Sequence, residues 1–225
     1  MKFVVITLFP EMFEGVIGNS ILSRAQDKKI ISVDFVNLRD HGLGVRKQVD
    51  DTPYGGGVGM VLRVDVVAKA IAAAKNEIKN TEYRIILMTP QGKRLEQEKL
   101  RSMAAYKGDY IIICGHYEGF DERIRSLVDE EISIGDFVLT GGEIPSMVLI
   151  DGITRLISGV LGSADSHIDE THSENGRIEY PHYTRPEKWD GEVVPPVLLS
   201  GNHKEIQMWR DEASKAKSQK TVEKH

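Results

Sequence analysis

The sequence predicts an α/β fold whose sheet is mostly parallel and covered by helices. Apolar runs of strand length at residues 3–9, 30–38, 84–88 and 110–114 alternate along the chain with segments of helical periodicity. This alternation is typical of parallel sheets, because each crossover between parallel strands needs room for a helix. Several predicted strands end in turns rich in glycine or proline, where the ligands of such sheets bind.

The composition is that of an ordinary globular protein. The 225 residues have a formal net charge of -5, with 40% hydrophobic and 28% charged residues. The acidic balance argues against indiscriminate nucleic-acid binding but leaves room for a local basic patch. Cys114 is the single cysteine, so a reducing compartment is expected. With no signal peptide and no apolar run that could span a bilayer, we expect a cytoplasmic protein without membrane association.

The first half of the chain is expected to form successive strand and helix pairs. Pro10 follows the first strand and is suited to open a helix. After the second strand, residues 39–60 form a long, glycine-rich loop without strands, which predicts a functional loop. Asp65 is the expected N-cap of the next helix, and a further helix is expected at residues 95–106.

Residues 111–145 carry more chemistry per residue than any other stretch. A buried strand ends at Gly115, and a second apolar segment at residues 132–139 leads into the turn Thr140-Gly141-Gly142-Glu143. Pro145 is expected to begin a helix that runs to residue 157. Two glycine turns, each between a strand and a helix, predict a ligand pocket made largely of backbone groups.

The sequence changes character after residue 162. Residues 163–176 are polar, acidic and without periodicity, which is typical of a linker or mobile lid. Helical spacing returns at residues 204–217. We therefore expect a first domain at 1–162, a linker or lid at 163–180 and a small helical C-terminal domain at 181–225.

Several common catalytic motifs are missing from the sequence. It has no phosphate-binding P-loop, no dinucleotide-binding glycine pattern, no zinc-ligand spacing and no nucleophile elbow. Composition and spacing alone thus predict an α/β enzyme with an unassigned ligand.

Six segments carry a more specific signal, in order along nearly the whole chain. They are FPEMF at 9–13, VDDTPYGGGVGM at 49–60, CGHYEG at 114–119, SIGDFVLTGGE at 133–143, PHYTRP at 181–186 and VPPVLLSGN at 194–202. Together they resemble the bacterial tRNA (guanine-N1)-methyltransferases that modify G37, the TrmD family of the SPOUT class. The resemblance implies a SPOUT-type sheet with a deep C-terminal trefoil knot, S-adenosylmethionine as methyl donor, tRNA as substrate and a homodimer.

The resemblance also implies a set of binding residues. The methyl-donor pocket of the family corresponds to Thr89, Pro90, Gly115, Tyr117, Glu118, Gly119, Ser133, Ile134, Gly135, Asp136, Phe137, Val138, Leu139, Gly141, Gly142 and Pro145. Backbone groups would satisfy the adenine edge, and Ile134 and Leu139 would enclose the ring. The implied tRNA contacts are Asp51, Tyr54, Gly59 and Arg185.

Methylation of guanine N1 requires a base for the N1 proton. The family base is an aspartate that precedes a serine and a phenylalanine, whereas this chain reads Asp169-Glu170-Thr171-His172-Ser173. Glu170 falls on the family position and is followed by a hydroxyl, so we prefer it as the base. A length difference before Pro181 leaves Asp169 open as the alternative.

Two further residues are implied to act in the reaction. Arg155 matches the arginine that orients guanine and stabilises O6, although it could instead be a cation at a helix C-terminus. Glu118 is linked in the family to magnesium dependence, which leaves magnesium open as a second cofactor. Its competing role is that of a carboxylate in the first turn of a helix.

Departures from the family pattern keep other functions open. Relatives generally continue past the segment at 219–225, so we expect a shortened C-terminal domain with weaker phosphate contacts. One alternative is a SPOUT methyltransferase for another RNA nucleotide. The other is a non-catalytic RNA-binding module, which the altered Asp169-Glu170 segment keeps open.

Overall fold

The computed structural model describes residues 1–162, 170–173 and 177–222. Contacts within the chain divide it into two compact units, Met1–Gly162 and Ser163–His225, and each is described by itself. None of the described helices combines the length and the apolar character needed to cross a bilayer.

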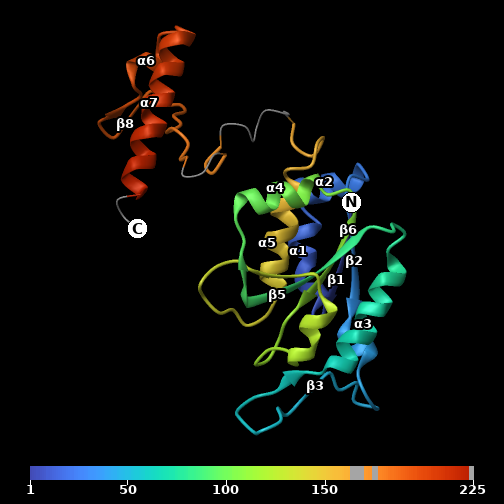
Figure 1. Cartoon of the computed structure of the whole chain (residues 1–225). Helices are drawn as coiled ribbons and strands as arrows, with labels where there is room; N and C mark the ends of the chain where they lie inside the picture. The colour runs from blue at the N-terminus through green and yellow to red at the C-terminus, as the bar shows by residue number, and fades with distance from the viewer. Residues whose placement is uncertain (163–169, 174–176, 223–225) are drawn as a thin grey trace. The chain divides into compact units, whose positions relative to one another are not determined.

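A five-stranded sheet forms the centre of the first unit (Figure 1). Its strands are β1 (Lys2–Thr7), β2 (Ser32–Asn37), β5 (Tyr83–Arg94), β6 (Asp109–Cys114) and β7 (Glu130–Ser133). They lie in the order β2-β1-β6-β5-β7, and each neighbouring pair is parallel. The predicted mostly parallel α/β sheet is confirmed, and the trefoil knot stays a prediction.

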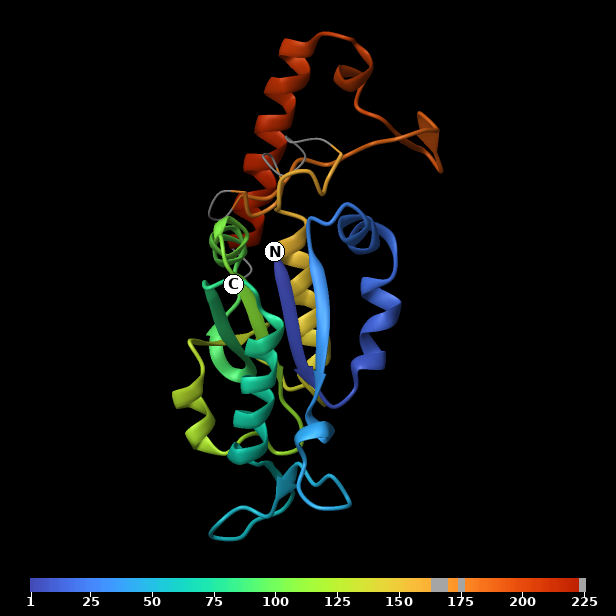
Figure 2. The ribbon, with the colours of Figure 1, turned by 90° about the vertical axis from the view of Figure 1, so that its right-hand side faces the viewer.

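Helices cover both faces of this sheet (Figures 1 and 2). On one face lie α1 (Glu14–Ile17), α2 (Ser20–Asp27), α4 (Gln97–Ala105) and α5 (Glu143–Thr154), and on the other lies α3 (Val64–Glu77). Successive side chains of a strand point to opposite faces, so Phe3 packs with Leu149 of α5 while Val4 packs with Val67 of α3. Burial on both faces explains why these strands read as continuous apolar runs.

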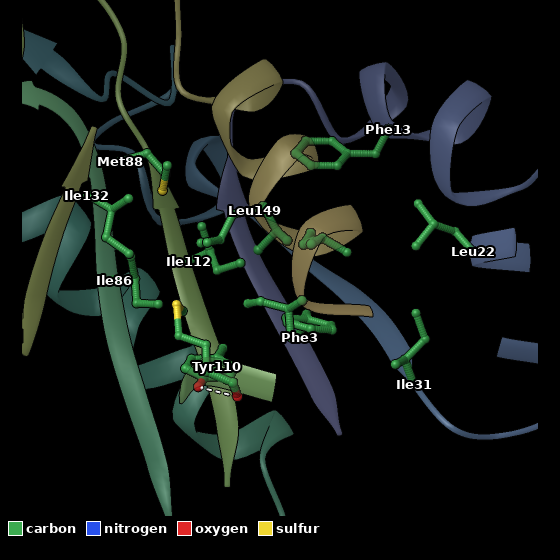
Figure 3. Close-up of a cluster of buried hydrophobic side chains, with 14 of the residues drawn as sticks. Phe3, Phe13, Leu22, Ile31, Ile86, Met88, Tyr110, Ile112, Ile132 and Leu149 are labelled. Atoms are coloured by element: carbon green, nitrogen blue, oxygen red, sulfur yellow. Dashed lines mark hydrogen bonds between the residues drawn. The ribbon is translucent and has the colours of Figure 1, made fainter. Parts of the chain in front are cut away.

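Figure 3 shows the cluster between the sheet and α5. Leu149 lies among Phe3, Ile112 and neighbouring apolar side chains of the strands. Tyr110 is fully buried there, and its hydroxyl donates to the carbonyl of Met103 over 2.9 Å. The buried phenol is therefore satisfied, and burial raises its pKa.

Four predicted strands have different limits in the structure. β1 and β2 end at Thr7 and Asn37, whereas β5 continues through residues 89–92 to Arg94. Met88 and Lys93 of β5 both pair with Ile132 of β7, so the residues between them bulge out of register. The prediction of a strand at 132–139 is wrong beyond Ser133. The later apolar residues line a cavity and do not pair with a neighbouring strand.

Helix beginnings also differ from the predictions. The helix expected after Pro10 is split into the 3-10 helix η1 (Pro10–Phe13) and α1. Asp65 is not the N-cap of α3, because Arg63 is the N-cap residue. Asp65 lies in the first turn of the helix and forms an ion pair with Arg63. α5 begins at Glu143, and Pro145 lies in its first turn, where a missing N–H is tolerated.

The loop predicted at 39–60 contains more structure than expected. η2 (Leu38–His41) opens it, and β3 (Asp50–Asp51) pairs antiparallel with β4 (Val61–Leu62). The glycines at 55–57 and 59 all have positive φ and form the end of this hairpin, which explains their number.

The described residues of the second unit form a short hairpin and two helices. β8 (Lys188–Trp189) pairs antiparallel with β9 (Glu192–Val193), followed by α6 (Pro196–Leu199) and α7 (His203–Val222). The helix predicted at 204–217 is confirmed within α7. Asp169, one of the two candidate bases, lies outside the described residues.

Candidate active site

A cavity of about 270 Å³ lies beyond the ends of β6 and β7, beside the bulge of β5. Two glycine turns, at 115–119 and 140–142, form much of its lining, and the loop that follows Ser133 forms another part. This is the edge of a parallel sheet where ligands bind.

Most residues implied to hold the methyl donor line this cavity. They are Thr89, Pro90, Gly115, Tyr117, Glu118, Gly119, Ser133, Ile134, Phe137, Val138, Leu139, Gly141, Gly142 and Pro145. Gly135 and Asp136 do not line it. Gly135 instead exchanges hydrogen bonds with the Ser133 hydroxyl, and the Asp136 side chain is 92% exposed near Arg94.

The turn after β6 has an unusual backbone. Tyr117 has a φ of 61°, a left-handed conformation that is rare for a residue other than glycine and costs about 1 kcal/mol. Burial raises the pKa of the Tyr117 phenol, and the Asp50 carboxylate raises it further while Arg39 opposes the shift. The phenol therefore stays protonated at neutral pH and can donate a hydrogen bond at the cavity.

Backbone hydrogen bonds join this turn to the glycine hairpin. Glu118 donates to the carbonyl of Met60 over 3.0 Å, and Leu62 donates to the carbonyl of Gly119 over 2.9 Å. The next 3-10 helix, η3 (Glu122–Leu127), begins four residues after Glu118. The competing role of Glu118 as a first-turn helix carboxylate is therefore wrong.

The implied tRNA contacts have different surroundings. Asp51 is paired with Arg63 over 2.6 Å, so its carboxylate also holds the base of the hairpin. Tyr54 is fully exposed at the end of the hairpin, and Gly59 packs against Glu118. Arg185 belongs to the second unit and is exposed.

The catalytic candidates lie in both units. Arg155 is the C-cap residue of α5, and its amide donates to the carbonyl of Asp151 over 3.0 Å. Glu170 belongs to the second unit, in a turn closed by the Ser173 amide, which donates to its carbonyl over 2.9 Å. The hydroxyl of Thr171 accepts from the Glu179 amide over 3.1 Å and so helps to shape this turn.

Sequence reasoning missed three side-chain pairs at or beside the cavity. Arg125 donates to Gln91 and to Glu131 and thereby holds the rim beside the bulge of β5. His116 lines the cavity and is bonded to the buried Glu143. His116 and Glu143 both belong to glycine-rich motifs of the sequence. Because these motifs are far apart in the chain, the sequence did not indicate that the two side chains are bonded.

The chain is similar to known proteins over nearly its whole length. The family model described as tRNA (Guanine-1)-methyltransferase TrmD matches residues 1–224. A tRNA (guanine-N(1)-)-methyltransferase of Staphylococcus haemolyticus is 53% identical over 214 residues, which cover 94% of this chain and 85% of the relative. A protein of the same name from Carboxydothermus hydrogenoformans is 51% identical over 215 residues, covering 95% and 83%. The chain belongs to the tRNA (guanine-N1)-methyltransferase TrmD family.

Proposed function

We propose that this chain methylates tRNA at N1 of guanosine 37, in tRNAs that have G36, with S-adenosylmethionine as the methyl donor. The observation that carries the proposal is the cavity between two glycine turns at the sheet edge, in a chain of this family.

The residues of the cavity fit a nucleoside-like ligand. Its volume of about 270 Å³ lies just below the range for small-molecule sites, which begins at about 300 Å³. Two positions of the lining require glycine. A Cβ atom on Gly142 would lie 2.6 Å from Cα of Cys114, and one on Gly115 would lie 2.5 Å from the Phe120 ring. Backbone and apolar groups such as Ile134 and Leu139 would hold the adenosine part. When bound, the donor supplies a methyl group carried on a positively charged sulfur.

The side chains of this chain handle the charge and the proton of guanine. N1 carries a proton that must leave as the new bond forms, and we assign its acceptance to the carboxylate of Glu170, with Asp169 as the alternative. Negative charge that develops on O6 is offset by the guanidinium of Arg155. A magnesium requirement would rest on Glu118 together with oxygen atoms of the substrates, which is how this ion usually binds at phosphate-containing sites.

We also propose a homodimer and a tRNA-binding second unit. Four apolar residues are between 41% and 47% exposed, namely Met12, Val16, Ile144 and Val148. The first two lie on η1 and α1, and the last two lie one turn apart on α5, which packs against η1. A second copy of the chain would cover this apolar surface, and Val148→Asp should then shift the mass measured by light scattering toward the monomer.

In the decisive experiment, unmodified tRNA transcripts are incubated with the protein and S-adenosylmethionine. Their nucleosides are then analysed by mass spectrometry. A transcript with G36 and G37 should gain 1-methylguanosine, whereas transcripts with A37, or with G36 replaced, should not. Methyl transfer to another nucleotide would support the alternative RNA methyltransferase. Binding of tRNA without any transfer would support the non-catalytic module and contradict the proposal.

A further inference from the structure

A buried carboxylate at the start of α5 has no part in the chemistry proposed above. The Glu143 side chain is 1% exposed, and a carboxylate removed from water is destabilising unless it is paired. Thr7 donates its hydroxyl to Oε1 over 2.6 Å, and His116 Nε2 lies 2.7 Å from Oε2. A helix N-terminus favours a carboxylate but requires neither its burial nor a histidine partner.

The three bonded residues come from three different parts of the first unit. Thr7 ends β1, His116 follows β6 in the first glycine turn, and Glu143 begins α5 after the second glycine turn. The His116 ring also packs edge-on against Phe9, with 5.0 Å between the ring centroids, which limits its movement. The pair thus connects the two turns that line the cavity.

The second glycine turn lies directly on this hydrogen bond. A Cβ atom on Gly141 would lie 2.5 Å from both His116 Nε2 and Glu143 Oε2. The two turns are also joined through the backbone, because Gly142 donates to the carbonyl of Gly115 over 2.8 Å. One side-chain bond and one backbone bond therefore set the separation of the turns.

We propose that His116 and Glu143 are positioning residues that hold the two glycine turns at the separation the methyl donor requires. His116 donates from Nε2 to the carboxylate, and Thr7 fixes the other carboxylate oxygen. The inference rests on the proposed function, because the affinity that the pair sets is that for the donor. Loss of the bond lets the turns separate, so donor binding weakens more than the chemical step.

The test compares His116→Leu, which removes the donor group, with His116→Gln, whose amide nitrogen can take the place of Nε2. Calorimetric titration of the full chain with S-adenosylhomocysteine, without tRNA, should give a Kd about tenfold higher for His116→Leu, equivalent to about 1.4 kcal/mol. For His116→Gln the Kd should stay close to the wild-type value. In methyl transfer, the KM for the donor should change far more than kcat.

The exposed pair of His182 and Glu179 provides a matched control. The distance from Nε2 of His182 to Oε1 of Glu179 is also 2.7 Å. The His182 side chain, however, is 63% exposed and lies in the second unit. His182→Leu should leave the Kd for S-adenosylhomocysteine unchanged. Glu143→Gln should weaken binding by about threefold and add little in the His116→Leu background, since both changes remove one interaction.

Each result bears on the proposal. Wild-type affinity in His116→Leu, or an equal loss in His116→Leu and His116→Gln, would overturn it. If His116→Leu does not fold, Glu143→Gln decides, and wild-type affinity in that variant would overturn it. A wild-type chain that binds no S-adenosylhomocysteine would instead overturn the proposed function.

Discussion

Gly59 lies against the side chain of Glu118. A Cβ atom on Gly59 would come within 2.9 Å of Cδ and 2.8 Å of Oε1 of Glu118, and the φ of Gly59 is 90°. The glycine hairpin therefore contacts a side chain that lines the cavity. No residue with a side chain fits at position 59 unless Glu118 moves.

This contact predicts that Gly59→Ala displaces Glu118 and lowers kcat/KM for methyl transfer by about 100-fold, as misplacement of a group at an active site does. Gly56→Ala is the matched control, since Gly56 also has a positive φ of 79° but no atom lies within 4 Å of its Cβ position. Both variants carry the same kind of backbone strain, about 1 kcal/mol, so only the overlap differs.

A second comparison isolates the cause of the Gly59 effect. In a Glu118→Ala background the overlap is gone, so Gly59→Ala should lower kcat/KM little further. Equal activities for Gly59→Ala and Gly56→Ala would contradict the steric explanation.

Glu170→Ala should lower kcat by at least about 100-fold while the Kd for S-adenosylhomocysteine stays at the wild-type value, because a general base acts on the proton and not on the donor. Single-turnover methyl transfer to tRNA measures the first quantity. Asp169→Ala is the neighbouring control and should retain most of the activity. The opposite pattern would assign the base to Asp169.

Arg155→Lys separates two roles of a cation at the end of α5. Lysine keeps the positive charge at the helix C-terminus, so the free energy of unfolding should change by less than about 0.5 kcal/mol. It lacks the planar guanidinium, so kcat should fall by about 100-fold if Arg155 binds guanine and its O6. Urea denaturation and single-turnover transfer measure the two effects. Wild-type kcat in Arg155→Lys would leave Arg155 only the helix role.

The carboxyl group of Asp121 should make a pH-dependent contribution to the free energy of unfolding. Its hydrogen bond from the Arg123 side chain, opposed by partial burial, lowers the pKa of Asp121 to about 2. A folded pKa below the unfolded value of about 4 stabilises the fold above pH 4, and this stability is lost as the pH falls toward 2. Asp121→Asn, which keeps the N-cap of η3, should lower the free energy of unfolding at pH 7 by about 0.5 kcal/mol.

The control for this prediction is the same pair of proteins at low pH. In urea denaturation the difference between wild type and Asp121→Asn should shrink as the pH is lowered from about 4 to about 2. A difference that is constant with pH would show that the charge of Asp121 contributes nothing.

Local sequence was sufficient to predict the sheet and the region of the cavity. Strands buried on both faces must be apolar along their length, so β6 and the start of β5 could be found from short windows. Glycine turns mark close approach of another group, and those at 115–119 and 140–142 do line the cavity. Local sequence could not separate core from cavity, however, and residues 134–139 were therefore predicted as strand.

The side-chain network of the site was decided only by the tertiary structure. Thr7 and Glu143 lie 136 positions apart in the sequence, His116 and Glu143 lie 27 apart, and Gln91 and Arg125 lie 34 apart. The two bonds of Glu143 exist because β6 lies beside β1 and both strands pack against α5, which brings their ends to the start of that helix. A hydrogen bond depends on distances of about 3 Å between elements, and no pattern within one element contains that information.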